Sequence, residues 1–136
     1  MRRLIDELRS SSRAVVWFVA ETGCRSGEAF NLRWEDVDEV GGWVNIQSRD
    51  GWTPKTLSSE RRLLIGGELL DEIRSIPKLG KFVFPSKLDP NRPRDNVRKS
   101  LVTAVKKAGL ERNGQPMKVT LKTLRKCFAT LQANSG

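Results

Sequence analysis

The chain has 136 residues, of which 38% are hydrophobic, with four Trp and five Phe. This composition is enough for one compact domain with a core and excludes a disordered chain. The formal net charge is +9, and the sequence contains neither His nor Tyr, which removes His-based acid–base chemistry, most zinc sites and a Tyr nucleophile from these residues.

No apolar run reaches the length that spans a bilayer, and the N-terminal MRRLIDELRS lacks the apolar region of a signal peptide. The two cysteines, Cys24 and Cys127, do not have metal-ligand spacing. We therefore expect a cytoplasmic protein with reduced thiols and no metal, associated with the nucleoid if the protein is prokaryotic.

The positive charge is concentrated in the last third of the chain. Residues 1–90 contain 14 Lys or Arg and 14 Asp or Glu, whereas residues 91–136 contain 11 Lys or Arg against Asp95 and Glu111. This asymmetry indicates a polyanionic partner, with nucleic acid as the first candidate. The alternative is a solvated basic surface that only keeps the protein soluble.

Hydrophobic residues recur at helical spacing in several segments. In chain order, helices are expected over residues 2–9, 13–21, 26–32, 68–76, 93–108 and 120–134. The serines at positions 10–12 separate the first two helices. Gly23 and Gly109 are placed to end the second and fifth helices, because Gly relieves left-handed strain just past a last turn. Pro93 suits the first turn of the fifth helix, and Thr120 suits the N-cap of the last.

After residue 41 the hydrophobic period changes to two, which predicts strands over residues 43–46, 52–57 and 61–65. Asp50-Gly51 is a hairpin turn signal. Pro54 indicates that the second of these strands, residues 52–57, lies at an edge of the sheet, because Pro lacks an N–H for pairing. Residues 113–116 are expected to form a loop. The predicted fold class is α+β, mainly helical, with a small three-stranded antiparallel sheet in a single domain.

Arg25 lies at the junction between the second and third predicted helices, after Gly23 and before Ser26, the expected cap of the third helix. A charged side chain at a tight turn is costly unless it has a partner. Arg25 is therefore either a structural ion-pair residue or the anchor of an anion site. Glu28 either orients Arg25 or has only a capping and helix-dipole role, and we favour the second.

Three further basic residues are candidates for an anion site at Arg25. Lys55 lies in the middle predicted strand, and Lys122 and Arg125 lie one helical turn apart at the start of the last helix. If they converge on Arg25, they repel one another unless an anion lies between them. A phosphate fits, since Arg offers forked donors and Lys a mobile point charge. Taken singly, each is more often an exposed or ion-paired residue.

These motifs resemble the catalytic domain of the tyrosine recombinases, or phage-type integrases. Residues 22–28 (TGCRSGE) and 32–38 (LRWEDVD) are similar to the first box of that family. Residues 54–56 (PKT) resemble the hairpin that carries its catalytic lysine, and residues 82–85 (FVFP) resemble the segment that follows. Residues 122–130 (KTLRKCFAT) resemble the second box, where the usual pattern is His-x-x-Arg.

The resemblance implies a role for each matched residue. Arg25 and Arg125 would bind non-bridging oxygens of the scissile phosphate and stabilise the charge of its pentacoordinate transition state. Lys55 would donate to the leaving 5′ oxygen or to a neighbouring base, and Glu28 would orient Arg25. Lys122 stands in the place of the family histidine, and this departure puts its role in question.

The family uses a Tyr nucleophile to form a transient 3′-phosphotyrosine link with DNA, without metal or other cofactor. Because these residues include no Tyr, we expect them to be inactive alone. The expected identity is most of a catalytic domain, without the N-terminal DNA-clamp domain and the C-terminal tyrosine segment. An isolated fragment is expected to be monomeric, whereas a full-length parent would assemble on DNA.

Double-stranded DNA is the expected partner, and no membrane partner is expected. Arg94, Arg98 and Lys99 on the helix over residues 93–108, together with Lys126, are the expected backbone contacts, with a solvated face as the alternative. The expected place of the Trp residues and Phe18 is the core rather than a base-stacking surface. Two hypotheses compete: a non-catalytic DNA-binding or regulatory remnant of the same fold, and a basic RNA- or protein-binding domain with chance motif matches.

Overall fold

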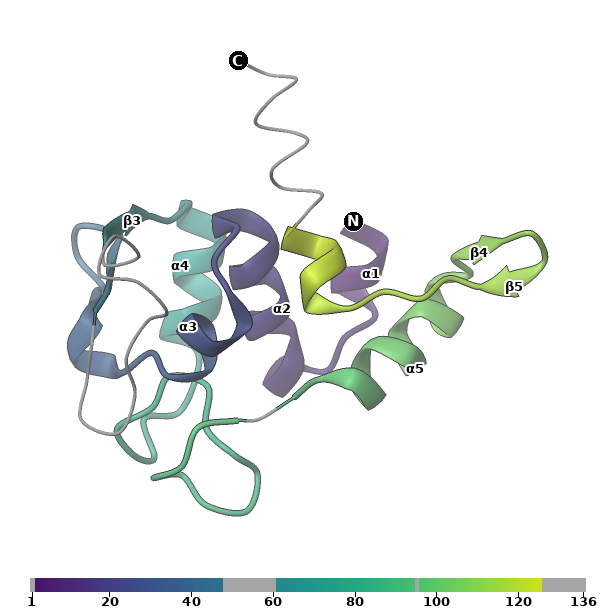
Figure 1. The fold of residues 1–136 in the computed structure, drawn as a ribbon. Coiled ribbons are helices and arrows are strands. Elements are labelled where there is room, and N and C mark those ends of the chain that lie inside the picture. Colours follow the sequence, from purple (N-terminus) through teal and green to yellow (C-terminus); the bar gives the residue numbers. More distant parts are fainter. Residues whose placement is uncertain (1, 48–60, 95, 126–136) are drawn as a thin grey trace.

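The computed structural model describes residues 2–47, 61–94 and 96–125 (Figure 1). The helices are α1 (Arg2–Asp6), α2 (Ser10–Thr22), α3 (Ser26–Phe30), α4 (Gly67–Arg74) and α5 (Arg98–Ala108), with a 3₁₀ turn η1 (Trp34–Asp36). The strands are β1 (Val37–Asp38), β2 (Trp43–Ile46), β3 (Arg61–Leu64), β4 (Glu111–Arg112) and β5 (Gln115–Pro116). Residues 121–125 are also helical. The predicted class, mainly helical with a small three-stranded antiparallel sheet, is confirmed.

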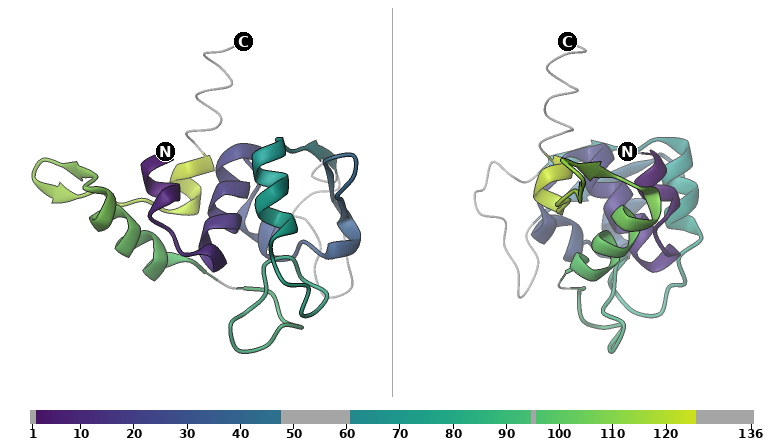
Figure 2. Two further views of the ribbon diagram at one scale, coloured as in Figure 1. Left: turned by 180° about the vertical axis from the view of Figure 1, so that it is seen from behind. Right: turned by 90° about the vertical axis from the view of Figure 1, so that its right-hand side faces the viewer.

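Helix α2 forms the centre of the core and packs against α1, α3 and α4 (Figures 1 and 2). Its residues Val15, Val16, Phe18 and Val19 are fully buried, as expected for a helix that is apolar on nearly all sides. Gly23 ends it with a left-handed φ of 70°, and its N–H donates to the carbonyl of Val19, which confirms the predicted C-cap. The serines do not separate two helices, because α2 already begins at Ser10.

The sheet has the order β1-β2-β3, and all neighbours are antiparallel. Val44 lies opposite both Val37 and Leu63, so β2 is the central strand. Among the described residues this sheet has three strands, and β1 was not predicted because it is only two residues long and shows no readable period. The predicted strand over residues 52–57, with its Asp50-Gly51 turn, lies outside the described residues.

The helix predicted over residues 93–108 begins five residues later, at Arg98. Pro93 instead forms an antiparallel bridge with Pro85, and the N–H of Arg94 donates to the carbonyl of Phe84 at 3.0 Å. Pro93 is therefore extended rather than helical, because this part of the chain pairs with the apolar segment over residues 82–85. Gly109 ends α5 with φ 67°, as predicted.

Arg94 consequently does not lie on an exposed helix face. It is 8% exposed, and its Nη2 donates to Ser12 Oγ at 2.9 Å while its Nε donates to the carbonyl of Asn96 at 3.0 Å. Ser12 is buried in α2, so Arg94 joins the start of α5 to the central helix. This buried placement differs from the exposed helix face that was expected from the sequence.

The segment predicted as a loop over residues 113–116 is the turn and second strand of a hairpin formed by β4 and β5. Asn113 and Gly114 have φ of 55° and 77°, the left-handed pair that suits a tight two-residue turn. The hairpin projects from the body of the molecule beyond the end of α5 (Figures 1 and 2).

Candidate functional site

Arg25 occupies the N-cap position of α3, with extended backbone angles of φ −76° and ψ 152°. Its N–H donates to Glu28 Oε1 at 2.7 Å. The side chain of Glu28, three residues after Arg25, therefore caps the N-terminus of α3. The sequence had predicted Ser26 as the cap. Helix α3 also ends at Phe30, two residues earlier than expected.

The Glu28 carboxylate is buried (4% exposed) and binds the Arg61 guanidinium through both oxygens. The Arg61 Nη1 to Glu28 Oε2 distance is 2.8 Å, and Nη2 lies 3.1 Å from Oε1. Burial by itself would raise the pKa of Glu28, but the hydrogen bonds from Arg61 and from the Arg25 N–H hold this pKa below its ordinary value of 4.5. Glu28 thus stays ionised and holds the backbone of Arg25 against β3.

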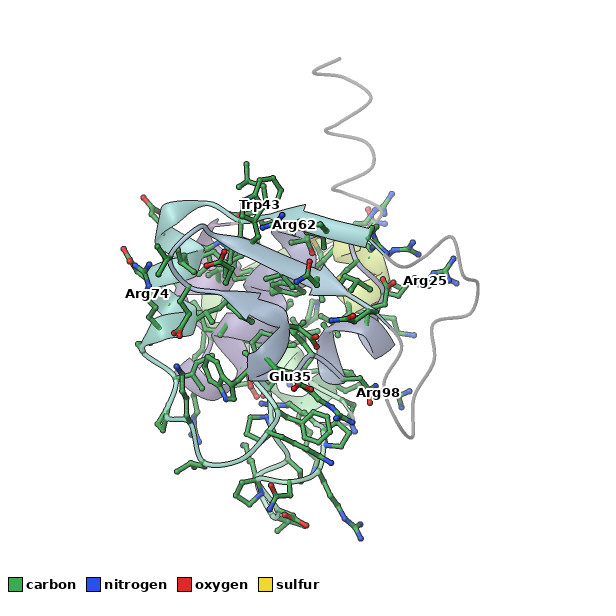
Figure 3. The ribbon with its side chains drawn as sticks, turned by 90° about the vertical axis from the view of Figure 1, so that its left-hand side faces the viewer. Arg25, Glu35, Trp43, Arg62, Arg74 and Arg98 are labelled. Atoms are coloured by element: carbon green, nitrogen blue, oxygen red, sulfur yellow. The ribbon has the colours of Figure 1, made fainter. Side chains whose placement is uncertain are left out.

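The guanidinium of Arg25 is less satisfied. Its Nη1 is buried and has no hydrogen-bond partner among the described residues. Glu28 contacts the backbone of Arg25, and the acceptor oxygens of Glu28 are used by Arg61. Figure 3 shows Arg25 projecting on the same side of the molecule as Arg98. A buried N–H of a charged group is costly without an acceptor, so this side chain is prepared to bind one.

Arg125 lies next to this junction although it is 100 residues further along the chain in sequence. Its Nε donates to the carbonyl of Gly23 at 2.8 Å, two residues before Arg25. The helical turn that carries it begins as predicted, since the N–H of Thr123 donates to Thr120 Oγ1 at 3.2 Å. Leu121 and Leu124 anchor this turn in the core, which leaves the rest of Arg125 exposed.

Cys24, between Gly23 and Arg25, is fully buried. Burial raises the pKa of its thiol to about 12, and the Thr22 hydrogen bond and the charges of Arg61 and Arg125 only partly oppose this. The thiol therefore stays protonated and packs as a small apolar group, in agreement with the packing role favoured from sequence.

A groove of about 750 Å³ runs beside this junction. Ser26 and Phe30 of α3, Arg98 of α5 and Lys122 all line it. Lys122 is exposed on the turn that carries Arg125. The structure thus brings parts of both predicted boxes and the start of α5 to one concave surface. We refer to Arg25, Arg125 and Lys122, of which Lys122 lines this groove, as the Arg25 cluster.

Other predicted residues lie elsewhere. Lys55 and Lys126 lie outside the described residues, and Lys99 is exposed beside a different pocket. Sequence reasoning missed Arg61, whose importance depends on a partner 33 residues away. Within the described ranges, no group of three or more His, Cys, Asp or Glu is placed to hold a metal ion.

No helix in the described part of the chain is both long and apolar enough to cross a membrane.

Comparison with known proteins gives consistent results. The model of the Phage integrase family matches residues 1–136. The structure is similar to that of XerA recombinase, with a TM-score of 0.74 and 27% identity, covering 99% of this chain and 48% of that chain. It also resembles the Tn1549 transposon integrase in complex with transposon right end DNA, with a TM-score of 0.73, 20% identity and coverage of 93% and 47%. This chain spans about half the length of these proteins. No curated protein matches it.

Proposed function

The chain belongs to the phage integrase family of tyrosine recombinases, and we propose that its Arg25 cluster binds one phosphate of double-stranded DNA. The observation that carries this proposal is the buried Nη1 of Arg25, which has no hydrogen-bond partner within the described residues. Support also comes from Arg125, whose Nε donates to the carbonyl of Gly23, two residues before Arg25. In this proposal the two guanidiniums share one anion, which offsets their mutual repulsion.

In this proposal Arg25 and Arg125 bind the non-bridging oxygens of the phosphate. They stabilise the additional charge that develops when the phosphorus becomes pentacoordinate. Lys122, which is exposed, adds a third donor at the position where the family pattern has histidine. Lys55 is proposed to donate to the leaving 5′ oxygen. Glu28 and Arg61 fix the backbone from which Arg25 extends.

Strand cleavage and rejoining through a 3′-phosphotyrosine is the proposed activity of a complete recombinase that contains this domain. None of the 136 residues is a Tyr. The nucleophile would therefore come from outside these residues, and their own contribution is to bind and polarise the phosphate. Arg98 and Lys99 are proposed to contact the DNA backbone beside the cluster, since both are exposed at the start of α5.

The salt dependence of DNA binding tests this proposal. For a duplex oligonucleotide, the logarithm of affinity is expected to fall linearly with the logarithm of salt concentration, by about 0.9 per phosphate contact. Fluorescence anisotropy between 50 and 200 mM salt measures the slope. An affinity independent of salt would exclude a backbone-contact mode and the proposal with it.

One observation favours a second candidate, a non-catalytic DNA-binding module of the same fold. Lys122 replaces the family histidine, and a protonated Lys cannot act as a general base. In such a module the exposed cations of α5 would be sufficient for binding. Affinity would then depend on Arg98 and Lys99 and be unaffected by substitution of Arg25, whereas the first proposal requires Arg25.

A further inference from the structure

The Glu28 carboxylate lies within electrostatic reach of two guanidiniums, those of Arg61 and Arg25. Burial alone would raise the pKa of Glu28, and the opposing effects, which prevail, include the charges of both arginines. Glu28 is also three residues after Arg25, a spacing at which a side chain reaches back to the N-cap residue. A buried carboxylate in this position can form its ion pair with either arginine.

The structure shows the pair with Arg61. Arg61 Nη1 lies 2.8 Å from Glu28 Oε2, and Arg61 Nη2 lies 3.1 Å from Oε1, so the guanidinium fork binds both oxygens. Oε1 also accepts the backbone N–H of Arg25 at 2.7 Å. The Arg25 side chain remains with a buried Nη1 that has no hydrogen-bond partner within the described residues.

We propose that Arg61 is a positioning residue for the phosphate site: by binding both oxygens of Glu28, it prevents this carboxylate from pairing with the guanidinium of Arg25. Arg61 does not touch the phosphate in this role. It neutralises the only carboxylate that contacts Arg25 among the described residues, so that Arg25 keeps its charge for an anion from solution. This inference rests on the proposed function, in which that anion is a DNA phosphate.

The physical reason is the cost of an uncompensated buried charge. The Glu28 side chain is 3% exposed, so it needs a cationic partner if Arg61 is removed. Arg25 is already bound to Glu28 through its backbone N–H and can supply that partner from its side chain. A phosphate would then have to displace a buried carboxylate before it could bind Arg25, which weakens its binding.

The neighbouring residue on β3 provides a matched control. Successive side chains of a strand point to opposite faces of the sheet. Arg61 binds Glu28, whereas the guanidinium carbon of Arg62 lies 4.5 Å from the centroid of the Trp43 ring. Figure 3 shows Arg62 with Trp43, apart from Arg25. Arg62→Ala therefore removes one cation from the same strand without releasing Glu28.

Duplex binding by fluorescence anisotropy is the first test, with affinities expressed per folded molecule. Arg61→Ala should weaken binding by roughly three- to tenfold and lower the salt slope by about 0.9, as if Arg25 were lost. Adding Glu28→Gln to Arg61→Ala should restore both, because the amide oxygen still accepts the Arg25 N–H but carries no charge. Arg62→Ala should change neither. Failure of Glu28→Gln to restore binding, or an equal loss with Arg62→Ala, overturns the proposal.

A merely structural role for Arg61 predicts a different pattern. In the Arg61→Ala background, Arg25→Ala should cause little further loss of affinity, because Glu28 already occupies Arg25. Losses that add would contradict the proposed role. If Arg61→Ala does not fold, Arg61→Lys replaces it, since Lys keeps the charge but not the fork. A smaller loss that Glu28→Gln relieves is then expected, and an unrelieved loss overturns the proposal.

The Arg25 Nε–H resonance in ¹⁵N-labelled protein provides a test without DNA. In Arg61→Ala this resonance should shift and exchange more slowly with solvent, and Glu28→Gln should reverse both changes. An unchanged resonance would show that Glu28 does not pair with Arg25 and would remove the role of Arg61. If instead the resonance changes as expected but Arg25→Ala leaves duplex affinity unaltered, the proposed function fails while the competition for Glu28 stands.

Discussion

Glu28→Ala is expected to lower the free energy of unfolding by about 2–3 kcal/mol, as measured by urea denaturation at neutral pH. The substitution removes the buried carboxylate, leaves the Arg61 guanidinium without its partner and opens the cap of α3 at the Arg25 N–H. Breaking a fully buried pair costs roughly 3–5 kcal/mol, and we expect less here because the Arg61 side chain is 34% exposed.

Glu35→Ala is the matched control. Glu35 also pairs with an Arg, but its side chain is 59% exposed and its Oε1 lies 3.8 Å from Arg33 Nη1. Exposed pairs contribute little, so a change of about 0.5 kcal/mol or less is expected. If Glu28→Ala costs no more than Glu35→Ala, the Glu28–Arg61 pair does not stabilise the fold.

The same pair predicts a pH dependence. The pKa of Glu28 is lower in the folded chain than its ordinary value of 4.5, so the unfolded state binds the proton more readily. The stabilisation is fully present above pH 4.5 and is lost as the pH falls through the lowered folded pKa. The difference in unfolding free energy between wild type and Glu28→Gln should therefore shrink below pH 4.5, and a constant difference would contradict the linkage.

Features that depend on neighbours in sequence could be predicted. Gly23 and Gly109 end their helices, and Thr120 caps the last turn, because a cap is determined within about four residues. The family and fold class could also be predicted, since the first box combines a Gly turn, an Arg and a Glu within seven residues. Arg25 was placed correctly at a helix junction for the same reason.

Features that depend on distant partners could not be predicted. The hydrogen bond from Arg94 to Ser12 joins residues 82 positions apart, and nothing near Arg94 distinguishes it from the exposed Arg98. Pro93 forms a bridge with Pro85 instead of beginning a helix, although its local preference is helical. Arg61 looked like an ordinary strand residue, although it neutralises the carboxylate that supports Arg25. The sequence thus allowed a prediction of residues that contact the phosphate, which stays a prediction, but it did not reveal Arg61, which holds the carboxylate behind Arg25.

Arg25→Ala is expected to weaken duplex binding by roughly tenfold or more, since a hydrogen bond to a charged group is worth about 1.5–3 kcal/mol. The salt slope should fall by about 0.9. The unfolding free energy should change little, because the structural bond at this position comes from the backbone N–H, which alanine retains. Arg25→Lys should restore the charge but not the forked geometry, giving an intermediate affinity.

Arg74→Ala is the matched control for Arg25. Arg74 is an exposed Arg on the opposite side of the molecule from Arg25 in Figure 3, where it contacts Asp71 and the carbonyl of Glu39. Its removal should leave both the affinity and the slope unchanged. If Arg25→Ala instead unfolds the protein while affinity per folded molecule is preserved, Arg25 is a structural ion-pair residue and the phosphate site is wrong.

A double-mutant cycle decides whether Arg25 and Arg125 share one phosphate. Each single alanine variant removes one donor, and the double variant removes both. Residues that contact the same anion should show a coupling energy of about 0.5–3 kcal/mol in the binding free energy, because loss of one loosens the hold of the other. Losses that simply add would place the two guanidiniums on different phosphates. The hydrogen bond from Arg125 to Gly23 favours the coupled result, because it holds the Arg125 side chain two residues from Arg25.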